Sequence, residues 1–313
     1  MKRKFLLVLG GLVILVGLVI LLSRKPEFIS PLSSSLLSQK INYAPYSFDY
    51  LQQREYFQSE IKLETMLKEQ STFTSYVFSF ASDGRKITGM ANIPKRKGKL
   101  PVATLLRGWV DEEIYQTGMG TEKMANFLAK NGFLSLAPDF LGYGGSDSAF
   151  PDMLLTRFFR PITVISLLNS LESLPQADLD KIVIWGHSNG GQVALSVLEI
   201  TGENIPTSLW APVSAPFPES VLYYADEMED KGEKLRRVIA EFEKEYDVSK
   251  YSIATYFNQI NTPLIIHQGM ADEAIPLEWS DELVNQLKNL GKRWLIINTK
   301  EKIIISPAVV LPK

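Results

Sequence analysis

A serine lies in a motif whose residue types and spacing suit a nucleophile. Residues 186–191 read Gly-His-Ser-Asn-Gly-Gly, which is the pattern G-x-S-x-G centred on Ser188. An apolar run precedes the motif and a helical pattern follows it, so the chain must turn sharply at the serine. Such a turn exposes the hydroxyl, and Gly186 and Gly190 omit side chains that would clash there. The motif predicts attack by Ser188 on a carbonyl carbon; the alternative is a purely structural turn.

Short apolar runs alternating with helical patterns would position this turn. A hairpin is indicated at Ser82-Asp83-Gly84-Arg85, and a possible edge strand at 59–65. Buried strands are predicted at 101–106, 133–138, 181–186, 207–212, 262–269 and 293–298. Helices are predicted at 50–57, 122–130, 154–174 with an interruption near Pro161, 192–200 and 278–290. Unbroken apolar strands alternating with helices predict an α/β class fold with a mostly parallel, doubly wound sheet.

One connection is much longer than the others. Residues 215–261 separate two predicted strands, and residues 225–246 within them are highly charged and helical in pattern. Connections in compact domains are usually far shorter. We interpret the stretch as a helical cap inserted over the strand ends, with a solvated helix remote from the site as the alternative.

Composition excludes several classes of function. The 313 residues include 33 Lys and Arg against 35 Asp and Glu, and no basic stripe occurs, so a nucleic-acid partner is not expected. No cysteine is present, which excludes disulfides, thiolate metal sites and a cysteine nucleophile. Only two histidines occur, His187 and His267. We expect neither a metal nor another cofactor.

The N-terminal residues have the pattern of a membrane anchor. Residues 5–23 are uncharged and almost entirely Leu, Val, Ile and Gly, and they follow Lys2, Arg3 and Lys4. A helix of this length spans nearly the ~30 Å hydrocarbon core of a bilayer. The charges favour an N-terminus inside the cell and an extracytoplasmic body. We therefore predict a signal anchor at 1–25, a linker and lead-in at 26–58 and one domain at 59–313. A single-pass protein of the cell membrane follows from this interpretation, with a buried core helix as the alternative.

Four segments together resemble the prolyl oligopeptidase (S9) branch of the α/β-hydrolases. They are GHSNGG, PDFLGYGGSD, LWAPVSAPFP and HQGMADEAIP, and the resemblance extends over residues 59–298. It implies an α/β-hydrolase fold and a serine peptidase or esterase without a metal. The large N-terminal propeller of the longer family members is absent from this sequence, so strict oligopeptidase specificity is not implied.

The resemblance also implies roles for other residues. The backbone amides of Trp109 and Asn189 would form the oxyanion hole, because the donors in this architecture follow the third strand and the nucleophile. Asp272 stands three residues after Gly269, where the family carries the acid that orients the base. Glu273 is the alternative carboxylate.

The histidine base is missing from its expected place. It should follow the last strand, but residues 299–313 contain no histidine. One additional base in or before the codon of Lys302 would permit Asn-His-Asn-Phe at positions 303–306, with histidine replacing Ile304. Lys300, Glu301 and Lys302 also suggest an adenine-rich tract, in which single-base slips are common. We hypothesise a frameshift; the alternative is a natural truncation that leaves a pseudoenzyme.

These observations predict a serine hydrolase that cleaves small esters or peptides through an acyl-enzyme. A catalytically inactive, membrane-bound binding module is the main alternative, because loss of the base should reduce the rate by orders of magnitude. A lyase or transferase on the same scaffold is a third possibility, since a fold does not determine a reaction.

Overall fold

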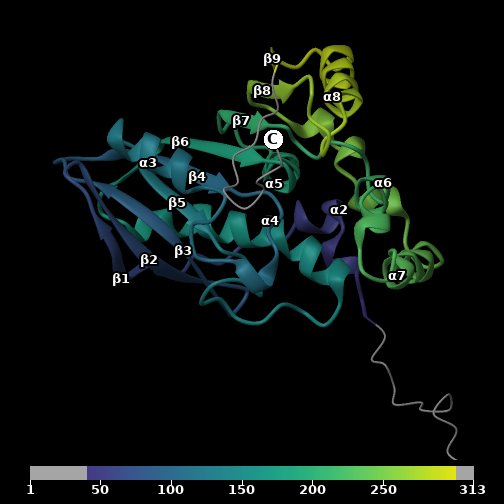
Figure 1. Ribbon diagram of the computed structural model, residues 1–313, viewed down its shortest axis with the longest axis horizontal. Coiled ribbons are helices and arrows are strands. Elements are labelled where there is room, and N and C mark those ends of the chain that lie inside the picture. Colours follow the sequence, from purple (N-terminus) through teal and green to yellow (C-terminus); the bar gives the residue numbers. More distant parts are fainter. Residues whose placement is uncertain (1–40, 301–313) are drawn as a thin grey trace, which may run out of the picture. The chain divides into compact units, whose positions relative to one another are not determined.

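A nine-stranded sheet runs through residues 41–300, the part of the chain that the computed structural model describes (Figure 1). The strand order is β1-β2-β3-β5-β4-β6-β7-β8-β9. Neighbouring strands are antiparallel from β1 to β5 and parallel from β5 to β9. The strands are β1 Lys62–Glu69, β2 Phe73–Ser82, β3 Arg85–Pro94, β4 Leu100–Leu106, β5 Leu134–Pro138, β6 Ala177–His187, β7 Thr207–Trp210, β8 Leu264–Gly269 and β9 Trp294–Thr299. The mostly parallel sheet confirms the predicted α/β class.

The hairpin between β2 and β3 forms where the sequence indicates it. Ser82 pairs with Arg85, and the two residues between them, Asp83 and Gly84, have φ values of 46° and 75°. Two consecutive positive φ angles are typical of the tight turn that matches the twist of antiparallel strands. The edge strand β1 begins three residues later than predicted, and every residue in it is exposed.

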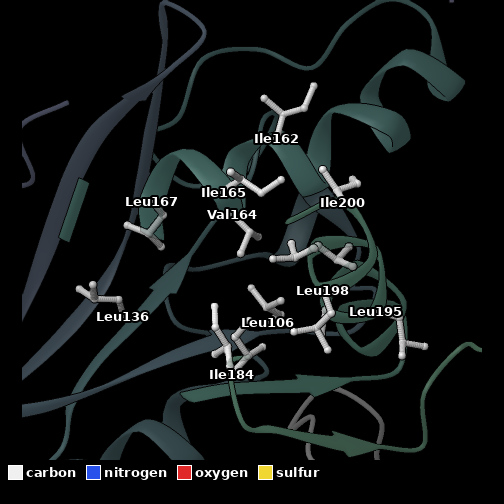
Figure 2. Packing of buried hydrophobic residues seen from close by; sticks show 14 of the residues in the cluster. Leu106, Leu136, Ile162, Val164, Ile165, Leu167, Ile184, Leu195, Leu198 and Ile200 are labelled. Atoms are coloured by element: carbon white, nitrogen blue, oxygen red, sulfur yellow. The ribbon is translucent and has the colours of Figure 1, made fainter. Parts of the chain in front are cut away.

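Helices cover both faces of the sheet. The helix α3 (Glu122–Lys130) packs on one face through Ala125, beside Leu105 and Trp185. The helices α4 (Met153–Asn169), α5 (Asn189–Thr201) and α8 (Leu277–Asn289) contribute to the larger core on the other face. Figure 2 shows this core, in which aliphatic side chains of α4 and α5 meet those of Leu106, Leu136 and Ile184 from the sheet. Burial on both faces explains why the parallel strands are unbroken apolar runs.

The predicted interruption near Pro161 does not occur. The helix α4 continues through Pro161 to Asn169. A proline inside a helix removes one hydrogen bond and costs about 3 kcal/mol. Ten residues of α4 are buried, most of them apolar, and packing of that face stabilises the helix despite the missing bond.

The long connection between β7 and β8 is helical, as its pattern predicts. It contains α6 (Glu219–Leu222) and α7 (Glu233–Glu243), followed by three short 3₁₀ segments at Val248–Tyr251, Ile253–Thr255 and Phe257–Gln259. One face of α7 is charged and exposed, whereas Phe242 is buried against Phe158 of α4 and Tyr43. The insertion is therefore anchored on α4.

The lead-in also packs against this unit, from Tyr43 onward. The short helix α2 (Phe48–Leu51) buries both of its end residues, and Phe48 stacks on Tyr256 at 4.9 Å between ring centroids. The sequence predicts a linker and lead-in at 26–58, and the aromatic side chains of Tyr43 and Phe48 attach the last part of this stretch to the folded unit. The predicted membrane span at 5–23 lies outside the described residues. Within residues 41–300, no helix combines the length and apolarity needed to cross a bilayer.

One ionisable side chain in the core makes the stability of the protein depend on pH. Glu199 of α5 is buried, and neither of its carboxylate oxygens has a hydrogen-bond partner among residues 41–300. Burial raises the pKa of Glu199 well above its usual value. The folded protein therefore keeps a proton on Glu199 at pH values where the unfolded chain has already lost it. The free energy of unfolding falls as pH rises from the unfolded pKa toward the folded pKa.

We expect Glu199→Gln to remove this dependence on pH. Its stabilising effect relative to the wild type should grow by up to about 1.4 kcal/mol per pH unit in that window. Urea unfolding at pH 5 and pH 8 measures the difference, with the exposed Glu203→Gln as the control. An equal effect of Glu199→Gln at both pH values would contradict the prediction.

Candidate active site

Ser188 occupies a strained turn between a strand and a helix. It directly follows β6 and caps α5, and its φ and ψ angles are 53° and −120°. A non-glycine residue in such a conformation is costly and persists only where surrounding contacts hold it. Two hydrogen bonds do so, because the Ser188 amide donates to the Trp210 carbonyl at 3.0 Å and the Ser188 carbonyl accepts from Val213 at 3.1 Å. The structure thus holds the serine at the carboxyl edge of the sheet.

The glycines of the turn allow three backbone segments to meet. A Cβ atom on Gly186 would lie 2.6 Å from the Gly190 carbonyl oxygen. A Cβ on Gly190 would lie 2.0 Å from the Leu106 carbonyl oxygen at the end of β4. Both obstacles are backbone atoms, which cannot rotate away. The glycines are therefore required by the close approach of β4, β6 and α5.

Gly190→Ala is expected to destabilise the protein by more than about 3 kcal/mol, because the methyl group would overlap the backbone of β4. Thermal or urea unfolding measures the loss. Gly145→Ala is a matched control, since its Cβ would meet only the Thr88 side chain at 3.2 Å. Similar stability of the two variants would show that β4 and α5 separate easily.

The two predicted oxyanion donors lie next to the serine. Asn189 is the first residue of α5, and Trp109 follows Gly108, whose Cβ would lie 3.0 Å from the Ser188 Cβ. Neither the Trp109 amide nor the Asn189 amide donates a hydrogen bond to a described residue. Two unpaired amides beside a serine, one of them at a helix N-terminus, can stabilise negative charge on an oxygen.

Arg107 fixes the loop that carries one of these amides. Its guanidinium donates to the Gly108 carbonyl at 2.9 Å and to the Asp139 carbonyl at 3.0 Å. The side chain is buried, and its Cζ lies 4.0 Å from the centre of the Tyr143 ring and 4.6 Å from that of Tyr115. A planar cation can donate two hydrogen bonds while stacking on aromatic faces. The sequence offered one signal of this role, an arginine at the end of an apolar strand.

Asp139, like Arg107, is a buried polar residue that holds loops near the serine. Its carboxylate accepts hydrogen bonds from three hydroxyls, those of Thr88 at 2.6 Å, Tyr115 at 2.7 Å and Thr117 at 2.9 Å. Burial raises the pKa of Asp139, although the three hydroxyls oppose this effect. These bonds attach residues 115–117 to β3 and to the end of β5. Buried hydrogen bonds therefore hold the start of the turn after β5 against neighbouring segments.

Asp272 lies in the loop after β8, at the same edge of the sheet as Ser188. One of its carboxylate oxygens accepts hydrogen bonds from the amides of Ala274 at 3.0 Å and Ile275 at 3.1 Å. The buried Gln268 side chain also steadies this loop by donating to the Ile275 carbonyl, while its oxygen accepts from Ser280. Ser188 and Asp272 follow strands that are separated only by β7.

Neither histidine within residues 41–300 follows the acid. His267 lies on β8, where its ring centre is 4.8 Å from that of Trp210 and burial lowers its pKa. His187 immediately precedes the serine and stacks on Trp185. A Cβ on Gly108 would lie 3.2 Å from His187 Nδ1, so this ring lies against the loop that carries Trp109.

The last described strand leads toward the acid loop. β9 ends at Thr299, whose carbonyl accepts a hydrogen bond from the Met270 amide at 2.9 Å. The predicted position of the base, 304, lies outside the described residues. Within residues 41–300, no group of three or more metal-ligating side chains occurs.

The sheet order and the strained serine turn define an α/β-hydrolase. Comparison with known families agrees with this class, because the model of the prolyl oligopeptidase family matches residues 120–302. This match covers more than half of the chain, and the protein belongs to the prolyl oligopeptidase family. The resemblance of the four sequence segments to this family is confirmed. No curated protein sequence matches the chain.

Solved structures share the fold. Acetyl xylan esterase 1 from Thermoanaerobacterium sp. JW/SL YS485 aligns with a TM-score of 0.61 and 16% identity, over 81% of this chain and 87% of that one. The acetyl xylan esterase from Paenibacillus sp. R4 gives 0.61 and 17%, over 80% and 84%. The acylaminoacyl peptidase of Pyrococcus horikoshii gives 0.56 and 21%, over 77% of this chain but 40% of that one. This chain is therefore similar to only part of the peptidase.

Proposed function

We propose that this protein is a serine hydrolase that cleaves ester or peptide bonds through an acyl-enzyme. Ser188 is the nucleophile, the amides of Trp109 and Asn189 stabilise the tetrahedral oxyanion, and Asp272 orients a histidine base. The observation that carries the proposal is the strained backbone of Ser188 between β6 and α5. Two backbone amides beside it, which donate to no residue within 41–300, support the assignment. Both esterases and a peptidase share the fold, which supports the bond classes without choosing between them.

The base belongs to the segment after β9 in this proposal, and a frameshift near Lys302 accounts for its absence from the sequence. An exposed apolar surface on β8 and β9 supports the idea. Ile265, Leu295 and Ile297 lie on adjacent positions of β8 and β9 and are 41%, 54% and 38% exposed. No described residue covers them. A frame-restored segment with a base and a following helix would bury this surface, which residues 41–300 leave open to water.

Sequencing the gene across the codons of residues 296–313 and beyond tests the frame. The frame-restored protein should then react with a fluorophosphonate probe at Ser188, as detected by mass spectrometry of the labelled peptide. Absence of labelling in a folded, frame-restored protein would refute the serine hydrolase. An intact reading frame with the present residues would favour the inactive binding module.

We further propose that residues 5–23 anchor the protein in the cell membrane and that the hydrolase lies outside the cytoplasm. The charge pattern around this apolar run supports the proposal. Membrane fractionation followed by protease treatment of intact cells tests it. A body that is released without detergent, or that resists protease until lysis, would contradict the anchor or its orientation.

A further inference from the structure

The loop that carries Asp272 has a hydrogen-bond partner in the long insertion between β7 and β8. Tyr224 follows α6 in that insertion, and its hydroxyl donates to the Ala274 carbonyl at 2.9 Å across 50 residues of sequence. Ala274 stands two residues after Asp272 in the loop that follows β8. The insertion therefore contacts the loop of the candidate acid directly.

One peptide group joins the Tyr224 hydroxyl to the Asp272 carboxylate. The Ala274 carbonyl and the Ile275 amide belong to the same planar peptide group. The carbonyl accepts from Tyr224, and the amide donates to a carboxylate oxygen of Asp272 at 3.1 Å. Because the group is rigid, its carbonyl and its amide cannot turn independently, and hydrogen bonds in series also polarise one another. A hydroxyl that fixes the carbonyl therefore also fixes the direction in which the amide meets Asp272.

Aromatic packing holds the Tyr224 ring in place. Its centre lies 5.0 Å from that of Tyr223 and 6.1 Å from that of Trp279 on α8. The ring also packs against a small apolar cluster that joins the acid loop to the loop after β7, whose buried members are Ala211, Val213, Ala215, Ile275 and Trp279. The Val213 amide in this cluster donates to the Ser188 carbonyl. The Tyr224 ring is thus seated on the segments that hold both candidate catalytic side chains.

The second carboxylate oxygen of Asp272 is left for the base. The amides of Ala274 and Ile275 both donate to the same oxygen of Asp272. The other oxygen accepts no hydrogen bond from a residue within 41–300. With one oxygen fixed by two amides, the other has a defined direction, and orienting a histidine ring requires such a direction.

We propose that Tyr224 is a positioning residue of the hydrolase, which acts through the peptide group between Ala274 and Ile275 to hold Asp272 in the direction that the base needs. The inference rests on the proposed function, and it assigns the insertion a part in the reaction. Burial raises the pKa of Tyr224, and the neighbouring Tyr223 and Asp272 add to this effect. The hydroxyl therefore stays protonated at neutral pH and remains a donor.

Tyr224→Phe in the frame-restored protein tests the proposal, because this change keeps the ring and removes only the hydroxyl. We expect kcat for a p-nitrophenyl ester to fall about fivefold, the equivalent of one net hydrogen bond, with little change in KM. Tyr223→Phe is the matched control. Its ring centre also lies 5.0 Å from that of Trp279, but its hydroxyl forms no hydrogen bond with a described residue. This control should keep the wild-type kcat.

The pH profile and a double-mutant cycle separate positioning from a general loss of structure. A misdirected Asp272 stabilises the histidine cation less, so the pKa of the base falls and the acid limb of kcat/KM moves to lower pH in Tyr224→Phe. In an Asp272→Asn background, Tyr224→Phe should have almost no further effect on kcat, because the group that it positions has already been replaced. An unshifted acid limb, or equal losses of kcat in the two backgrounds, would overturn the inference.

Hydrogen exchange of the full chain, with its present C-terminus, gives a result that does not depend on activity. In peptides that span residues 270–279, the amides that donate to Asp272 should exchange about fivefold faster in Tyr224→Phe, because the loop then opens by breaking one hydrogen bond fewer. Tyr223→Phe should leave their exchange unchanged. Unchanged exchange in Tyr224→Phe would also overturn the inference. A frame-restored wild type without esterase activity or fluorophosphonate labelling would instead refute the proposed function, and the exchange rates would still decide whether Tyr224 holds the acid loop.

Discussion

Ser188→Ala in the frame-restored protein is expected to lower kcat for a p-nitrophenyl ester by about 10⁶-fold. Without the hydroxyl no acyl-enzyme can form, and only the oxyanion donors and substrate binding remain to accelerate attack by water. Initial rates measured with increasing ester concentration separate kcat from KM. Fluorophosphonate labelling should disappear in the same variant.

Ser208→Ala is the control for this experiment. Ser208 lies on β7, and its hydroxyl accepts a hydrogen bond from the Trp210 indole at 3.1 Å, a contact that the proposed mechanism does not use. Its loss should change kcat only slightly. Activity within tenfold of the wild type in Ser188→Ala would show that another residue is the nucleophile.

Replacing residues 303–306 by Asn-His-Asn-Phe is expected to raise the esterase activity of this protein by about 10⁴-fold or more. The reason is that loss of the histidine in a serine triad costs as much as loss of the serine itself. The decisive change within the replacement is Ile304→His. The same four-residue replacement with Ile304→Gln is the matched control, because glutamine is polar but cannot act as a general base at neutral pH.

Asp272 gives a second check on the same prediction. Asp272→Asn in the restored protein should lower kcat by about 10⁴-fold, because the acid orients the base and stabilises its cation. Glu273→Gln should have a much smaller effect. If the histidine replacement leaves the activity unchanged while the protein folds, the base is not at position 304.

Much of the architecture follows from local pattern. Apolar runs located six of the strands to within a few residues, and Asp83-Gly84 located the hairpin, because these features depend on burial and on backbone conformation. Pro161 shows where local reasoning fails. The sequence predicts a break there, but burial of the apolar face of α4 stabilises a continuous helix. Tertiary contacts also decide how the lead-in is attached, since Tyr43 and Phe48 pack on aromatic side chains that are distant in the sequence.

The candidate site likewise has features that the sequence predicts and features that only the tertiary structure shows. The sequence by itself determined the serine turn, because a sharp turn requires glycine at fixed spacing. It also predicts roles for Asn189, Trp109 and Asp272 from their places after the strands. Only the tertiary structure decided what holds these residues in place. The stacking of Arg107 and the three hydroxyls on Asp139 join segments that are far apart in the chain. Contacts of this kind cannot be predicted from local pattern, because they depend on which elements the fold brings together.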